Sequence, residues 1–439
     1  MWYNPLVPNH KPDLVRAIGR WSLAALMVNL IIGGGIFELP STVAGILGGQ
    51  SPIAYLIAAA GMGIIAACVA EVASRFQQAG GPYLYAKAAF GRFLGLQTGW
   101  LLWLTRVSAA AAVANVFIDY LPGFWPQAKG PATRLVVLTI LIGGLAAINI
   151  RGVKMGTRVS NFFTVAKVLP LVILVVGGLV FIHIHGSPVP PVAESHPAGA
   201  WMNAVLLLIF AYGGFEAALI PAGEVKNPAR DAPVALMAAL VIVTTVYFLV
   251  QVVVVHMLAN SAQTDLPLSA AAHVFGGSSM ATIISVGALL SSIGYFAANM
   301  IATPRITFAF AEQGDFPRWF AAIHRRYQTP YISIVAFAVL VWALTLMGTF
   351  RWNAALSATS RLFVYGMACA ALPMLRKKCP GQEGFHLPGG LVFAVMGIAF
   401  ALVLVSRMGV AELIALAITA VVSFLNWLVV RGNTPSPNS

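Results

Sequence analysis

Four ionisable side chains of this 439-residue sequence lie inside or beside long apolar stretches, where a charge is costly. Arg106 lies within WLTRVSAAAAVANV and Lys167 within FFTVAKVLPLVIL, while Glu38 and Glu216 each follow a cluster of glycines. A charged group at the centre of a bilayer costs about 2.5–3.5 kcal/mol on insertion scales, so such residues face the interior of a helix bundle and find a partner there. These groups are therefore candidates for recognising a solute inside a membrane or for carrying a proton.

The two glycine clusters are Gly33-Gly34-Gly35-Ile36-Phe37 and Tyr212-Gly213-Gly214-Phe215-Glu216. Each glycine costs a helix about 1 kcal/mol relative to alanine. A cluster also frees backbone groups at membrane depth, which is tolerated around a cavity or ligand. The alternative is that these glycines only allow helices to pack closely.

Free backbone groups at both clusters would suit a solute that carries both a carboxylate and an ammonium group. N–H groups at the start of the half-helix after the first cluster suit its carboxylate, because a helix N-terminus is also positively polarised. Carbonyl groups at the second cluster suit its ammonium. The predicted binding residues of the two clusters are Ile31, Gly33, Gly34, Gly35, Phe210, Ala211 and Gly213.

Catalytic and metal-binding motifs are missing from the sequence. There is no HExxH, GxSxG or P-loop motif and no pair of aspartates inside an apolar stretch, so we predict neither an enzyme nor an ATP-driven pump. The three cysteines, Cys68, Cys369 and Cys379, show no metal-binding or disulfide spacing. No metal and no cofactor are expected.

The elements that must position these residues are membrane-spanning helices. Hydrophobic residues make up 59% of the chain and charged residues only 9%, against about a quarter charged in a soluble domain. Apolar runs of about 20 residues, enough to cross a bilayer as a helix, recur throughout. The predicted spans are 17–48, 52–74, 88–121, 132–150, 159–184, 201–222, 232–258, 280–310, 331–349, 354–375, 391–408 and 410–430.

The charges orient these twelve spans. Nineteen of the 26 basic residues fall on the side of the N-terminus, and the net charge is +13. By the positive-inside rule both termini are cytoplasmic, in a plasma (inner) membrane, and the basic excess does not indicate nucleic acid. Three basic residues lie within spans: Arg106, Lys167 and Arg361, the last interpreted as reaching the cytoplasm or pairing with a loop.

The glycine clusters fall in spans one and six, the first members of two successive sets of five. Interrupted helices at corresponding positions of two halves predict an inverted-repeat transporter with its substrate at the midplane. We expect one domain over 1–431, with a first repeat at about 17–184, a second at about 201–375, and two added helices at 391–430. The Pro/Ser/Asn-rich tail 432–439 is expected to be disordered.

Several motifs resemble those of the amino acid/polyamine/organocation (APC) transporters. GGGIF (33–37) is similar to their G-S/T-G-I/V-F signature, with Gly34 in place of the hydroxyl residue, and FAYGGFE (210–216) to their F-x-x-x-G-x-E. Further matches lie at 81–100, 224–233 and 302–330. The resemblance implies an all-α, LeuT-like 5+5 inverted repeat with discontinuous helices 1 and 6, and transport of amino acids or related amines.

The resemblance also implies roles for single residues. Phe210 stands where the family places an aromatic that closes over the substrate. Lys167 matches a lysine that, in one subgroup, replaces a sodium ion, which implies sodium-independent transport. Arg106 falls about where cation-selective relatives line the side-chain pocket, and a fixed guanidinium there favours small neutral or acidic substrates. Glu38 is a candidate to neutralise Arg106, and Asn299 is a candidate polar contact.

Some alternatives stay open at this point. Lys167 would otherwise extend to the cytoplasmic surface, Arg106 would otherwise form a structural ion pair, and Asn299 would otherwise join helices. Glu216 either takes up a proton or ties the loose amides of the interrupted helix. The predicted function is an amino acid permease, by proton symport or exchange, with a small-molecule amino acid and the lipid bilayer as partners. A cationic amino acid or polyamine antiporter and an amino acid sensor are the alternatives.

Overall fold

The structure is a computed structural model, and within its described residues every regular element is a helix. Eight segments are long and apolar enough to cross a membrane, and four shorter apolar helices accompany them. The predicted tail 432–439 lies outside the described residues, as do Lys11, Arg16, Lys154 and Lys226. The structure describes residues 19–76, 80–152, 157–189, 195–218, 228–378 and 384–431.

The helices follow the predicted spans closely. The first half of the chain forms α1 (Arg20–Ile31), the 3-10 turn η1 (Gly34–Phe37), α2 (Leu39–Leu47), α3 (Ser51–Ser74), α4 (Pro82–Phe90), α5 (Arg92–Tyr120), α6 (Pro131–Ile150) and α7 (Thr157–His185). The second half forms α8 (Ala198–Tyr212), α9 (Phe215–Ala218), α10 (Pro228–Met257), α11 (Pro267–Glu312), α12 (Tyr331–Met347), α13 (Phe350–Lys378), α14 (Gly390–Val405) and α15 (Val410–Val430).

Two predicted spans differ from the helices observed. The span predicted to start at 88 is divided, because Gly91 adopts φ 92°, a conformation that favours glycine, and separates α4 from α5. The span predicted at 280–310 corresponds to the part of α11 after Gly277, whose φ of 61° interrupts the helix; the part that begins at Pro267 was not predicted. In both places a glycine with positive φ sets the boundary.

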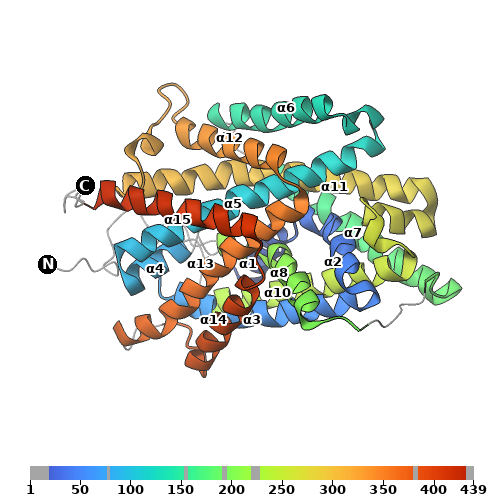
Figure 1. Cartoon of the computed structure of the whole chain (residues 1–439), viewed down its shortest axis with the longest axis horizontal. Coiled ribbons are helices and arrows are strands. Elements are labelled where there is room, and N and C mark those ends of the chain that lie inside the picture. Colours follow the sequence, from blue (N-terminus) through green and yellow to red (C-terminus); the bar gives the residue numbers. More distant parts are fainter. Residues whose placement is uncertain are drawn as a thin grey trace.

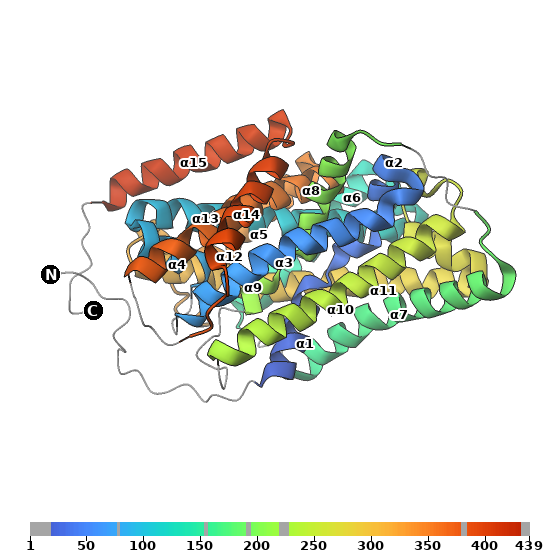
Figure 2. The same cartoon turned by 90° about the horizontal axis from the view of Figure 1, so that it is seen from below.

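Most of the helices run roughly along the long axis of the molecule (Figures 1 and 2). The most apolar part of α5 is 83% buried and that of α13 is 72% buried, whereas those of α6 and α15 are each 22% buried. The first pair therefore forms the centre and the second pair lies at the periphery, where α15 is seen in Figure 2. Exposed apolar side chains such as Ile140 and Val429 fit a surface that faces lipid.

The chain leaves helical geometry at both glycine clusters, as predicted. After α1, Ile32 and Gly33 are extended, and after α8, Gly213 is extended and Gly214 takes φ 119°. The two interruptions touch, because a Cβ at Gly214 would lie 2.6 Å from the carbonyl oxygen of Leu30. Only glycine allows this approach.

Ion pairs gather at the end of the molecule that carries α4. Buried Asp315, just after α11, binds Lys87 of α4 and accepts from Arg92 of α5 at 2.7 Å. Glu71 of α3 binds Arg75 at 2.8 Å and Arg376 of α13 at 2.6 Å. These contacts join elements from both halves of the chain at this end.

Candidate functional site

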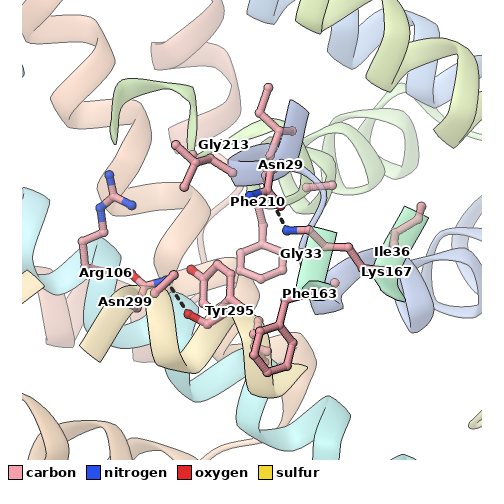
Figure 3. Close-up of a pocket in the computed structure, with 18 of the residues that line it drawn as sticks. Asn29, Gly33, Ile36, Arg106, Phe163, Lys167, Phe210, Gly213, Tyr295 and Asn299 are labelled. Atoms are coloured by element: carbon pink, nitrogen blue, oxygen red, sulfur yellow. Dashed lines mark hydrogen bonds between the residues drawn. The ribbon is translucent and has the colours of Figure 1, made fainter. Parts of the chain in front are cut away.

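A cavity of about 70 Å³ lies between the two interruptions (Figure 3). Every predicted binding residue except Gly34 lines it. The lining residues are Asn29, Leu30, Ile31, Gly33, Gly35, Ile36, Arg106, Val113, Phe163, Lys167, Phe210, Ala211, Gly213, Gly214, Tyr247, Gly294, Tyr295, Ala298, Asn299 and Arg361.

Close packing explains the glycines of the first cluster. A Cβ at Gly35 would lie 2.5 Å from the ring of Phe210, so the ring rests directly on the backbone of η1. At Gly34 a Cβ would lie 3.0 Å from Val113 and 3.1 Å from Ser292 Oγ, which places this residue against α5 and α11 rather than on the cavity. The N–H groups at the start of η1 remain beside the cavity, where a helix start leaves them without intrahelical partners.

Phe210, in the last turn of α8, has a ring that lies in the middle of the site. Only 8% of the residue is exposed, and its ring meets Phe350 edge to face at 5.9 Å. Figure 3 shows the ring between Arg106 on one side and Lys167 on the other. In this view the two cationic side chains lie on opposite sides of the aromatic group.

Lys167 of α7 is buried, with 7% of the residue exposed. Its ammonium donates to the main-chain carbonyl of Asn29 in the last turn of α1 (Figure 3). The C-terminal end of a helix is negatively polarised and favours a cation. Extension to the cytoplasmic surface, the alternative interpretation of this lysine, is therefore wrong.

Glu216 of α9 is buried and makes four contacts. One carboxylate oxygen accepts from Arg361 at 2.8 Å and lies 3.3 Å from Arg106. The other accepts from the Tyr365 hydroxyl at 2.8 Å and from the N–H of Gly214 at 2.9 Å. The carboxylate thus ties the interrupted segment to α13 and α5.

The interpretation of Arg361 as a cytoplasmic or loop-paired residue is wrong. It lies on the cavity in the middle of α13, only 3% exposed, and pairs with Glu216. Its guanidinium crosses Gly213 so closely that a Cβ there would lie 1.9 Å from it. Two in-span charges of opposite sign are natural partners, and this was the signal in the sequence that could have identified the pair.

Glu38 does not neutralise Arg106, because the carboxylate beside Arg106 is Glu216. Glu38 lies outside the cavity lining, in the electrostatic field of Asp119, Asp265 and Arg134. The prediction that Glu38 neutralises Arg106 was wrong because Glu38 lies between η1 and α2, whereas Arg106 faces Glu216 at the start of α9.

Asn299 of α11 lines the cavity, but its amide also donates to the carbonyl of Tyr295 at 3.3 Å, within the same helix. Sequence reasoning missed two tyrosines of the site. The ring of Tyr295 lies against Gly33, and the hydroxyl of Tyr247 donates to the carbonyls of Ile31 and Ala211 at 3.2 and 3.4 Å. A tyrosine in an apolar span gives no signal of such a role.

A family profile described as amino acid permease matches residues 18–430. The chain belongs to this family. It is 28% identical to the branched-chain amino acid permease BcaP of Bacillus subtilis, over 95% of this chain and 92% of that protein. It is also 28% identical to the serine/threonine exchanger SteT of the same organism, over 84% and 85%.

A third relative is the vacuolar cationic amino acid transporter 4 of Arabidopsis thaliana. It is 31% identical over 77% of this chain and 60% of that protein. The permease is therefore a multi-pass membrane transporter of amino acids and not an enzyme.

Proposed function

We propose that the permease moves small amino acids across the plasma membrane by alternating access around the cavity between the two interrupted helices. The observation that carries the proposal is that eight of the nine predicted binding residues, from the five elements α1, η1, α5, α8 and α11 or their ends, meet at that cavity. We further propose twelve spans in a 5+5 inverted repeat, with α14 and α15 added and both termini cytoplasmic.

Recognition of the amino acid backbone follows from the polarity of the interrupted helices. The start of η1 offers N–H groups to the substrate carboxylate. The end of α8, with the carbonyls of Phe210 and Ala211, offers acceptors to the ammonium. Phe210 then closes over the bound substrate, since its ring already rests on Gly35.

Transport is independent of sodium in this proposal. Carbonyl groups of unwound or terminating helices are the usual ligands of a coupling sodium ion in such transporters. Here the Lys167 ammonium already binds such a carbonyl, that of Asn29. A fixed positive charge at this point substitutes for the cation that sodium would supply.

Glu216 has a structural role in this proposal rather than that of a proton carrier. Its two oxygens are engaged by Arg361, Tyr365 and the Gly214 N–H. Proton symport and amino acid exchange then remain the two coupling modes, and the exchanger among the relatives gives precedent for the second.

Counterflow in proteoliposomes tests the proposal. Vesicles loaded with unlabelled amino acids should take up labelled small amino acids at equal initial rates in sodium and in potassium buffers. An imposed proton gradient separates symport, which it accelerates, from exchange, which needs only internal substrate. Uptake that requires sodium, or uptake of none of the amino acids offered, would contradict the proposal.

A further inference from the structure

We infer that the substrate of the permease carries a net negative charge, as an acidic amino acid does, and that Arg106 binds its side-chain carboxylate. The inference rests on the proposed function, because it concerns the same cavity. It narrows the substrate from small amino acids in general to those with a second carboxylate.

The balance of charge around the cavity is positive. Arg106, Lys167 and Arg361 line it, and no Asp or Glu is part of the lining among the described residues. Glu216, just behind it, is the acidic partner of both arginines. Even with Lys167 left out of the count, two guanidinium groups face one carboxylate.

An uncompensated charge in a buried site costs several kcal/mol, because low-dielectric surroundings replace its hydration shell poorly. A zwitterion with a neutral side chain has no net charge and leaves the excess positive charge of the cavity unchanged. A substrate of net charge −1 reduces this excess positive charge. Cationic amino acids would increase it, and like charges in such a site repel strongly.

Arg106 has unused hydrogen-bonding capacity. Its Nε and Nη2 atoms are buried and have no hydrogen-bond partner among the described residues, and the residue is only 7% exposed. A guanidinium has five N–H donors in a planar fork that matches the two oxygens of a carboxylate. Buried donors of this kind call for an acceptor, and the cavity is the space beside them.

The contacts of Glu216 leave Arg106 as its weaker partner. Arg361 and Tyr365 each approach the Glu216 carboxylate to 2.8 Å, whereas Arg106 stays at 3.3 Å without hydrogen-bond geometry. Arg361 is thus held by the protein, and Arg106 is the guanidinium that can turn to a second carboxylate. Figure 3 shows it at the opposite side of Phe210 from Lys167.

Two pairs of natural amino acids are suited to test the inference. Aspartate and asparagine have the same shape and differ by one charge, so this pair isolates the electrostatic effect from size. Glutamate and glutamine form a second pair that is one methylene longer.

The test is uptake of labelled aspartate and labelled asparagine by proteoliposomes containing the full-length protein. We expect kcat/KM for aspartate to exceed that for asparagine at least tenfold, and a lower ratio overturns the inference. If asparagine or alanine is carried and aspartate is not, the inference fails while the proposed function stands. If no amino acid is carried, the proposed function itself fails.

Substitution of Arg106 tests whether this residue causes the preference for aspartate over asparagine. In Arg106→Gln the aspartate-to-asparagine ratio should fall at least fivefold, and an unchanged ratio in folded protein overturns the assignment. Where this variant does not fold, Arg106→Lys provides the test. In Arg106→Lys the KM for aspartate should rise at least fivefold and the KM for asparagine less than twofold. Equal rises in the two KM values overturn the assignment.

The matched control is Arg407→Gln. Arg407 donates to Asn203 at 3.1 Å, is exposed, and lies outside the cavity lining. The same loss of charge there should leave the aspartate-to-asparagine ratio unchanged. A fall equal to that of Arg106→Gln would mean that net protein charge sets the preference, and would overturn the assignment to Arg106.

Discussion

Within the part of the chain that the structure describes, Lys167 donates to a backbone carbonyl and not to a carboxylate. Its substitution therefore leaves no acidic side chain there without a partner, and the effect reports on the lysine alone. Its removal leaves the Asn29 carbonyl without its charged donor, and Asn29 Oδ1 is already buried without a partner among the described residues. Unpaired acceptors of this kind cost about 1–3 kcal/mol each. The contact between α7 and the end of α1 therefore depends on the ammonium.

We predict that Lys167→Ala lowers initial counterflow at least tenfold, because α1 loses the cation that holds its C-terminal end. Reconstituted protein amounts are equalised by immunoblot. The control is Lys378→Ala, since Lys378 also donates to main-chain carbonyls, those of Ala88 and Ala89, at 3.0 and 2.8 Å, but is exposed. Wild-type rates in Lys167→Ala would show that the lysine is dispensable.

The packing of Phe210 on Gly35 predicts a steric effect. In Gly35→Ala the new methyl group would lie 2.5 Å from the ring, so the ring or η1 must shift. Overpacking of this kind typically costs about 1–3 kcal/mol. We expect a lower thermal midpoint in lipid nanodiscs and slower uptake.

Two further variants isolate the cause of this effect. Gly143→Ala should be harmless, since Gly143 lies on exposed α6 with nothing within 4 Å of its Cβ position. In the double variant Gly35→Ala, Phe210→Ala the two thermal losses should not add, because the ring that clashes is gone. Additive losses would show that Gly35 acts through something other than the ring.

At the scale of helices, the two interruptions are held by neighbouring elements rather than by their own hydrogen bonds. Tyr247 of α10 reaches carbonyls of both interrupted helices, and Tyr365 and Arg361 of α13 hold Glu216. Arg361 and Tyr365 are four residues apart, so they share one face of α13. The interrupted α8–α9 segment is therefore attached to two long helices.

Tyr365→Phe removes one hydrogen bond to the Glu216 carboxylate without changing the shape of the side chain. Hydrogen bonds to charged groups contribute about 1.5–3 kcal/mol, so the thermal midpoint should fall measurably. The same substitution at Tyr331, a partly exposed residue at the start of α12, is the control. An equal, small effect at both positions would show that the Tyr365 hydroxyl adds nothing to the attachment.

The sequence predicts the interruptions well because they depend on local backbone chemistry. Glycine clusters in apolar runs identify both, and the charges within spans identify Arg106, Lys167 and Glu216. Pairing is harder: Arg361 and Glu216 are 145 residues apart, and only the packing of α13 against the start of α9 brings them together. The early start of α11 was missed because Gly276-Gly277 interrupts the apolar pattern where the helix bends.

At the scale of the whole molecule, carboxylates collect at the end where the basic residues are concentrated. Glu71, Asp231 and Asp315 each pair with arginine or lysine near that end of the bundle. These pairs neutralise only part of the positive charge, because the chain has 26 basic and 13 acidic residues. We predict that the excess of lysine and arginine at this end faces the cytoplasm, because these residues are retained on the cytoplasmic side.

Cysteine labelling in intact cells tests this orientation. In a background with Cys68, Cys369 and Cys379 replaced by alanine, Gly123→Cys lies on the outer side in our topology and Arg325→Cys, in the α11–α12 connection, on the inner side. Both positions are exposed, and the Cβ position of Gly123 has nothing within 4 Å, so access depends on sidedness alone. A membrane-impermeant maleimide should label Gly123→Cys in intact cells and Arg325→Cys only after permeabilisation. The reverse pattern would place both termini and the basic end of the molecule outside the cell, and would contradict the positive-inside rule for this protein.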